Sequence, residues 1–113
     1  METNYDFFFA DAAEGLKKKI RFKDIAYIES AGNYVLLAGD SLKVMLHRSM
    51  NSIQGLLSNG QFLRIHKSYI ISVDHIDCIQ GNTCIIRMEN KSIPIPIGVT
   101  FKKEILEKLG IVL

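Results

Sequence analysis

The chain has 113 residues, of which 48% are hydrophobic and 23% charged, and its formal net charge at pH 7 is +2. This length fits one domain with its own core, and the composition excludes an intrinsically disordered chain. The sequence has no apolar run of the ~18 residues that a membrane-spanning helix needs, and the three phenylalanines at 7–9 are too few for a signal peptide. We therefore expect a cytoplasmic protein.

Hydrophobic alternation predicts short strands in the first half of the chain. The expected strands are 6–10 and 16–22 as a first hairpin, 26–30 and 34–38 as a second pair, and 41–47. In the second arm of the first hairpin, alternation distributes the three lysines at 17–19 over both faces. This lysine run therefore indicates a strand rather than a localisation signal, and any basic surface must be assembled by folding.

The period then changes from two to that of a helix. Met50, Ile53, Leu56 and Leu57 recur at helical spacing. Ser49 or Ser52 is suited to cap the start of this helix, and the pair Asn59-Gly60 is suited to end it.

The second half of the chain again reads as strands, followed by one helix. The expected strands are 62–65, 69–72, 77–80, 83–88 and 92–97. Pro94 and Pro96 cannot donate amide hydrogen bonds, so the last strand must lie at an edge or a strand end. The final helix carries an apolar stripe of Phe101, Ile105, Leu106 and Leu109 and is expected to end at Gly110.

The two cysteines are predicted to be free thiols. If Gly81 and Asn82 form a two-residue turn, Ile79 lies opposite Cys84 and Cys78 lies opposite Ile85. The two sulfur atoms then lie on opposite faces of the sheet, which is compatible with a reducing compartment.

Catalysis and metal binding have little support in the sequence. Asp and Glu are scattered singly, and His75 with Cys78 lacks a third residue that would orient a base. Both phosphate-loop motifs, GxGxxG and GxxxxGK[ST], are missing, and the three histidines have no metal-ligand spacing. We expect no enzyme activity, no metal and no cofactor.

Polar and basic residues gather instead in the predicted loops between strands. Asn33 and Tyr34 lie at one turn, and His66, Lys67 and Ser68 lie at another. A third set surrounds the start of the last helix and comprises Gly98, Val99, Thr100, Lys102 and Lys103. Asn can pair with adenine, Lys reaches guanine or phosphate, and hydroxyl groups favour phosphate, so this pattern favours contact with DNA.

Three sequence motifs resemble the LytTR DNA-binding domain family. Residues 62–76, FLRIHKSYIISVDHI, are close to the family hallmark. Residues 20–37, IRFKDIAYIESAGNYVLL, and residues 93–106, IPIPIGVTFKKEIL, resemble segments that precede and follow it. The resemblance covers about 7–109, so we interpret 1–113 as a single LytTR-like domain.

The resemblance implies a mainly β fold, an elongated stack of small antiparallel sheets with two short helices. It also implies the output domain of a two-component transcriptional regulator, which binds double-stranded DNA through loops in successive major grooves. Paired direct repeats as the target, a homodimer on DNA and a preceding receiver domain are further implications. The implied DNA-contacting residues are Asn33, Tyr34, His66, Lys67, Ser68, Val99, Thr100 and Lys102.

The chain departs from the family pattern at two places. Ser72 stands where many members have Asn, and Gly98-Val99 stands where many have Ser-Arg. The second change removes bidentate recognition of guanine at that loop, although Val99 could contact a thymine methyl group.

Several of these residues also have a structural interpretation. Arg64 is interpreted first as a solvated or ion-paired strand residue, with phosphate contact as the alternative. His66 could orient its loop, Asn33 could occupy a left-handed turn, and Tyr34 could pack rather than read a base. His47 and Arg48 are additional candidates for phosphate contact.

Two further functions remain as alternatives to DNA binding. A protein-interaction module on the same scaffold, with reduced DNA recognition, agrees with Val99 and the modest charge. An RNA-binding β-domain is less favoured, because the sequence lacks paired exposed aromatic residues on adjacent strands.

Overall fold

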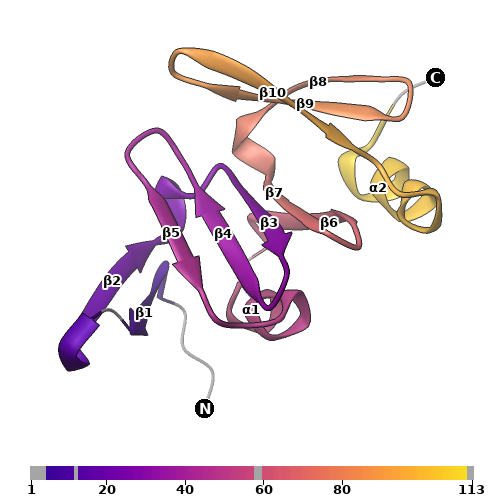
Figure 1. Cartoon of the computed structure of the whole chain (residues 1–113). Coiled ribbons are helices and arrows are strands. Elements are labelled where there is room, and N and C mark those ends of the chain that lie inside the picture. Colours follow the sequence, from indigo (N-terminus) through magenta and orange to yellow (C-terminus); the bar gives the residue numbers. More distant parts are fainter. Residues whose placement is uncertain (1–4, 12, 58–59, 112–113) are drawn as a thin grey trace.

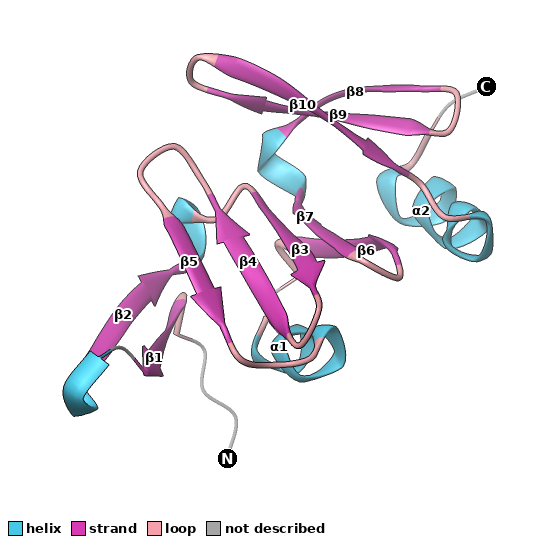
Figure 2. Ribbon diagram, viewed as in Figure 1, coloured by secondary structure: helices cyan, strands magenta, loops and turns pink. Residues whose placement is uncertain are grey.

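The computed structural model describes residues 5–11, 13–57 and 60–111 (Figure 1). Its strands form three antiparallel sheets, and short helices accompany them (Figure 2). The principal extents are 50 × 36 × 25 Å, and the radius of gyration of 14.2 Å exceeds the ~13 Å typical of a compact chain this long. The predicted fold class, an elongated stack of small sheets, is confirmed.

The N-terminal sheet is a hairpin of β1 (Phe7–Asp11) and β2 (Lys17–Arg21), connected through the 3-10 helix η1 (Ala13–Gly15). The lysines at 17–19 lie on β2 and are all exposed, as expected for a solvated strand. Phe22 lies just beyond β2, in the 3-10 helix η2 (Phe22–Asp24), and is buried.

The central sheet has five strands in the order β5-β4-β3-β7-β6. Its strands are β3 (Tyr27–Ala31), β4 (Tyr34–Ala38), β5 (Lys43–Leu46), β6 (Phe62–His66) and β7 (Tyr69–Ser72). All neighbours are antiparallel, and the pairing of β6 with β7 shifts register between Arg64 and His66. This irregularity lies beside the turn that carries Lys67.

The third sheet has the order β10-β9-β8, so β10 is an edge strand, as its prolines require. Its strands are β8 (Ile76–Gln80), which follows the 3-10 helix η3 (Val73–His75), β9 (Thr83–Met88) and β10 (Lys91–Pro96). Ile95 is buried between the exposed Pro94 and Pro96. Cys78 pairs with Ile85 and Ile79 with Cys84, which confirms the predicted register, and both cysteines are free thiols.

The helices begin largely where their capping residues predict. Ser49 caps α1 (Met50–Leu56), because its hydroxyl accepts a 3.0 Å hydrogen bond from the Ser52 amide. This helix ends at Leu56, earlier than the predicted end at Asn59-Gly60; Asn59 lies outside the described residues. The second helix, α2 (Lys102–Leu109), follows the 3-10 helix η4 (Val99–Phe101) and ends at Gly110 with a φ of +64°, as predicted.

Two hydrophobic cores lie on opposite faces of the central sheet. The first, which includes Ile28 and Ile70, joins the sheet to α1 and the N-terminal hairpin. The second, which includes Ile71 and Ile105, joins it to α2 and the third sheet. Ile70 and Ile71 are neighbours on β7 and belong to different cores, because successive strand residues point to opposite faces.

None of the helices in the described residues is long and apolar enough to cross a membrane. Those residues also contain no group of three or more His, Cys, Asp or Glu side chains placed to hold a metal ion.

Candidate nucleic-acid interface

Four connecting segments meet at one end of the central sheet, and we call this surface the basic end. It consists of the β3–β4 turn (32–33), the β5–α1 loop (47–49), the β6–β7 turn (67–68) and residues 98–103. Ala31 pairs with Tyr34, and Val35 pairs with Leu46, so the first two segments leave the sheet at the same end. In Figure 1 these segments lie around α1 and extend along the lower right toward α2.

Two backbone hydrogen bonds attach the other two segments to this end. The Ser30 amide donates to the Ser68 carbonyl at 2.9 Å, which joins the β6–β7 turn to the end of β3. The Gly98 amide donates to the Ile65 carbonyl at 2.7 Å, which joins the segment before α2 to β6. The candidate DNA-binding loops, distant in sequence, therefore form one surface.

The four segments of this surface carry only positive charges. They carry Arg48, Lys67, Lys102 and Lys103, all exposed, and contain no Asp or Glu. Two carboxylates lie nearby. Glu104 directly follows residues 98–103 and pairs with Lys108, and Glu29 on β3 accepts a 3.2 Å hydrogen bond from the Tyr69 hydroxyl. Burial and this carboxylate both raise the pKa of Tyr69, so Tyr69 remains an uncharged donor.

The cations of the basic end form no ion pairs within the described residues. Within the described part of the chain, the ion pairs are Lys17 with Asp11 and Lys108 with Glu104.

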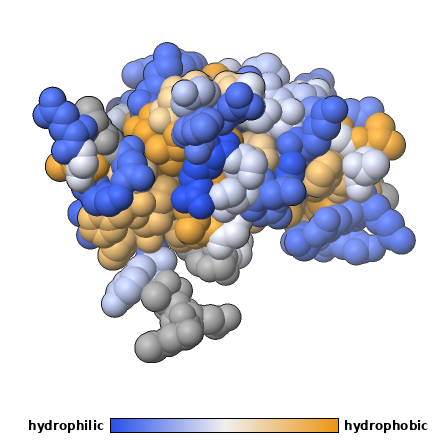
Figure 3. All heavy atoms as spheres, turned by 60° about the horizontal axis from the view of Figure 1, so that its bottom comes forward, coloured by the Kyte–Doolittle hydropathy of each residue, from blue (hydrophilic) through white to orange (hydrophobic). Residues whose placement is uncertain are grey.

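Figure 3 turns the lower side of Figure 1 forward; hydrophilic residues cover much of its right half, and hydrophobic colour gathers at the left, over the N-terminal hairpin. The opposite end of the sheet mixes carboxylates with cations, including Asp24, Asp40, Glu89 and Lys91.

The β6–β7 turn is held by its own side chains and by Arg64. The Ser68 amide donates to His66 Nδ1 at 3.1 Å, so the imidazole stabilises the turn. The Arg64 guanidinium donates to the carbonyl oxygens of Lys67 at 2.6 Å and of His66 at 3.4 Å. The Lys67 side chain itself is exposed.

The interpretation of Arg64 as a solvated or ion-paired residue is wrong. Its side chain is partly buried, and its Nη1 donates to Asn51 Oδ1 at 2.6 Å and to Gln54 Oε1 at 3.1 Å. All these acceptors are neutral oxygens of α1 and of the turn. The alternation that places Arg64 on a strand face does not reveal that α1 covers this face.

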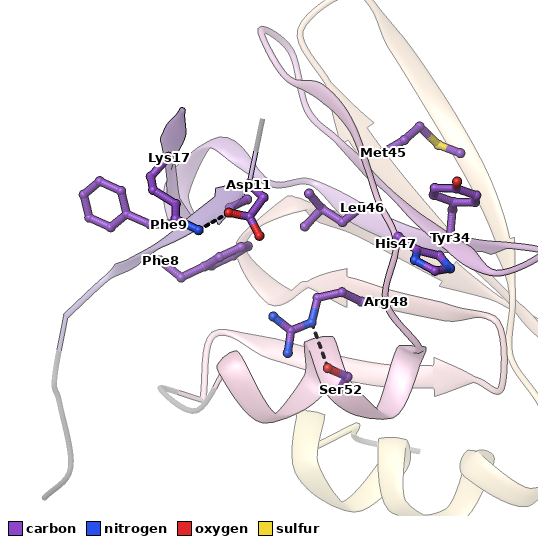
Figure 4. A pocket seen from close by; sticks show the side chains of 11 residues that line it. Phe8, Phe9, Asp11, Lys17, Tyr34, Met45, Leu46, His47, Arg48 and Ser52 are labelled. Carbon is purple, nitrogen blue, oxygen red and sulfur yellow. Dashed lines mark hydrogen bonds and ion pairs between the residues drawn. The ribbon is translucent and has the colours of Figure 1, made fainter. Parts of the chain in front are cut away.

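At the β3–β4 turn, Gly32 has the left-handed backbone, with a φ of +63°. The interpretation of Asn33 as the left-handed residue is therefore wrong, and Asn33 is exposed at the tip. Tyr34 packs on His47, with ring centroids 4.9 Å apart, and is 46% exposed. Figure 4 shows these two rings beside Arg48, whose Nε donates to Ser52 Oγ at 2.8 Å.

The segment before α2 packs closely on His66. A Cβ atom on Gly98 would lie 3.5 Å from the Cα of His66 and 3.1 Å from the Phe101 ring. Val99 and Thr100 are exposed on η4, and Lys102 donates to Asn82 Oδ1 at 2.7 Å. Asn82 is neutral, so this contact does not compensate the positive charge of Lys102.

Comparison with known proteins identifies the family. Residues 17–110 match the family model of the LytTr DNA-binding domain. The chain belongs to the LytTR family. No curated protein matches the sequence. A similar solved structure is the LytTr DNA-binding domain of a putative methyl-accepting/DNA response regulator from Bacillus cereus, with 20% identity and a TM-score of 0.73 over 96% of this chain and 100% of that one.

In this LytTR domain, Ser72 lies away from the basic end. Ser72 is buried, its amide donates to the Ala26 carbonyl at 2.9 Å, and its hydroxyl lies 3.0 Å from His75 Nδ1. Both partners lie toward the other end of the central sheet. The departure from Asn at this position therefore concerns packing and leaves the basic end unchanged.

Sequence reasoning did not find the roles of Asn51, Gln54 and Asn82. Asn51 and Gln54 are three residues apart on α1, so their spacing indicated a shared polar face of that helix. Nothing in the local pattern indicated which strand this face approaches. The sequence places Asn82 in a turn, and its contact with Lys102 depends on how the third sheet packs beside α2.

Proposed function

We propose that this LytTR domain binds double-stranded DNA sequence-specifically, as the output domain of a two-component transcriptional regulator. The observation that supports this most is the convergence, at one end of the central sheet, of four segments that together carry four exposed cations and no carboxylate. DNA phosphates attract such a surface, and loops on a sheet can enter a groove. The membership of the LytTR family supports the same function.

The proposed roles follow from side-chain chemistry and exposure. Lys67 and Asn33, both exposed at turn tips, would read base edges in the major groove. Ser68, Thr100 and Lys102 would contact the sugar–phosphate backbone, and Arg48 would extend these contacts at the flank. His66 and Tyr34 would mainly support their loops, with base contact through the exposed part of Tyr34.

The remaining features of the proposal come from the family resemblance. They include loops that enter successive major grooves of the duplex. We further propose that residues 1–113 act as a single domain, that two copies bind paired direct repeats, and that a receiver domain precedes this domain in the full-length cytoplasmic protein.

Selection of bound duplexes from a random pool would return the target site and test the proposal directly. On the selected site, we expect Lys67→Ala to weaken binding by ~1–3 kcal/mol, because it removes one base contact. Lys91→Ala is the matched control, since Lys91 is an exposed lysine of β10 that lies beside the β4–β5 turn, at the opposite end of the central sheet. Gel-shift titration would measure both, and thermal unfolding would confirm that each variant folds.

Two results would contradict the proposal. One is a failure to enrich any duplex. The other is equal affinity of the Lys67→Ala and Lys91→Ala variants, because the position of the charge would then be irrelevant.

A protein-interaction module is the second candidate, and the exposure of Val99 favours it. Val99 is 90% exposed on η4 within the basic end, where an apolar group adds nothing to phosphate binding. Retention on random duplex DNA at two salt concentrations separates the two functions. A DNA-binding domain elutes steeply with salt, whereas an interaction module does not.

A further inference from the structure

We infer that Arg64 is a positioning residue for DNA recognition, which sets the shape of the β6–β7 turn without itself contacting DNA. The inference rests on the proposed function, since the turn matters only if Lys67 reads DNA. It departs from the interpretation in which an arginine beside a DNA-binding loop contacts phosphate.

The guanidinium bridges the reading turn and α1. On one side, Nη2 and Nε donate to the carbonyl oxygens of Lys67 and His66, which are consecutive residues around the turn. On the other side, Nη1 donates to both Asn51 and Gln54 on the surface of α1. One planar group therefore holds the backbone of the turn against a helix that belongs to the first core.

This geometry needs the arginine fork. The guanidinium has five donors in one plane, and these contacts use all three of its nitrogen atoms. A lysine ammonium carries the same charge as a compact point on a flexible stem, so it cannot bind both sides at once. Because the guanidinium already donates to four protein oxygens, it has little capacity left for a phosphate.

The contacts also connect the turn to the segment before α2. The Arg64 guanidinium carbon lies 6.0 Å from the centroid of the Phe101 ring, and Phe101 belongs to η4. His66, whose carbonyl Arg64 binds, packs against Gly98 at the start of that segment. The β6 register shift between Arg64 and His66 lies at the centre of these contacts. Loss of the fork would therefore loosen both the central turn and its neighbour.

The main test compares Arg64→Lys with wild type on the selected duplex over a series of salt concentrations. The variant keeps the charge and loses the fork, so we expect about a tenfold loss of affinity, the effect of losing one hydrogen bond to a charged group. The slope of log K against log salt should stay unchanged. A direct phosphate contact would be retained by lysine, or its loss would reduce the slope by about one unit.

Hydrogen exchange of the free protein provides a readout without DNA. In Arg64→Lys, the amide of Ser68 should exchange faster than in wild type, because the backbone of the turn is no longer held. Amides of the third sheet, such as that of Ile86, should keep their protection. If wild type binds no duplex but this difference appears, the proposed function fails and the structural role of Arg64 stands.

A second variant keeps the test decisive if Arg64→Lys does not fold. Asn51→Ala with Gln54→Ala removes the helix anchors at exposed positions and leaves Arg64 and its charge in place. We expect a several-fold loss of affinity with an unchanged salt slope. Wild-type affinity in either variant, a slope reduced by one unit in Arg64→Lys, or unchanged exchange of the turn would each overturn the inference.

Discussion

At the residue scale, the basic end combines charged side chains with one exposed apolar side chain, Val99. Four cations of the surface lack ion-pair partners within the described residues, so their charges are available to phosphates. Val99 lies in the same segment as Lys102 and Lys103. An apolar group there can contact a thymine methyl group but cannot neutralise a phosphate or bind guanine.

The substitution Val99→Arg should therefore strengthen binding to duplex DNA. The added guanidinium is expected to steepen the slope of log K against log salt by about one unit, because one more phosphate is neutralised. Val99→Gln is the uncharged control and should leave the slope unchanged. Fluorescence anisotropy at several salt concentrations measures both variants, and equal slopes would place Val99 away from the DNA.

At the element scale, two glycines, Gly39 and Gly55, differ in the space around them. Gly39 lies at the β4–β5 turn, where a Cβ atom would be 1.8 Å from the Asp24 carbonyl oxygen of η2. Gly55 lies within α1, where a Cβ atom would meet nothing within 4 Å. One glycine is thus required by close packing, while the other only weakens its helix.

Alanine at these two positions should have opposite effects on the free energy of unfolding. Gly39→Ala is expected to destabilise the fold by ~1–3 kcal/mol or more, because neither backbone segment can move without separating η2 from β4. Gly55→Ala should stabilise it by ~0.5–1 kcal/mol through helix propensity. Urea denaturation measures both changes, and effects of the same sign would refute this account of the two positions.

At the scale of the whole molecule, the five-stranded central sheet contributes residues to two hydrophobic cores, one on each face. Ile28 belongs to the core beside α1, and Ile71 belongs to the core beside α2. The basic end draws segments from both sides of this sheet, so its shape depends on both cores. We therefore expect the two cores to unfold together.

Ile28→Ala and Ile71→Ala should each destabilise the whole fold by ~2–5 kcal/mol, because each removes a fully buried side chain. Each variant should unfold in one transition, with circular dichroism and amide exchange reporting on both cores. Two separate transitions in either variant would indicate that the cores are independent.

Much of the fold was predictable from the sequence, since strands, caps and turns depend on neighbouring residues. Alternation located the strands, Ser49 and Gly110 marked helix ends, and the Gly81-Asn82 turn set the cysteine register. The end of α1 was predicted too late, at Asn59-Gly60 instead of Leu56. The short 3-10 helices were not predicted, because single helical turns lack a repeating hydrophobic period.

The sequence alone therefore determined the family, the mainly β fold and the polar loops that are candidates for DNA contact. Only the tertiary structure decided that these loops form one surface and that Arg64 supports the central turn. The bond from Arg64 to Asn51 spans 13 residues, and the bond from Ser30 to Ser68 joins strand β3 to the β6–β7 turn. Such contacts depend on how separate elements pack, and a periodic pattern within one element carries no information about its partner.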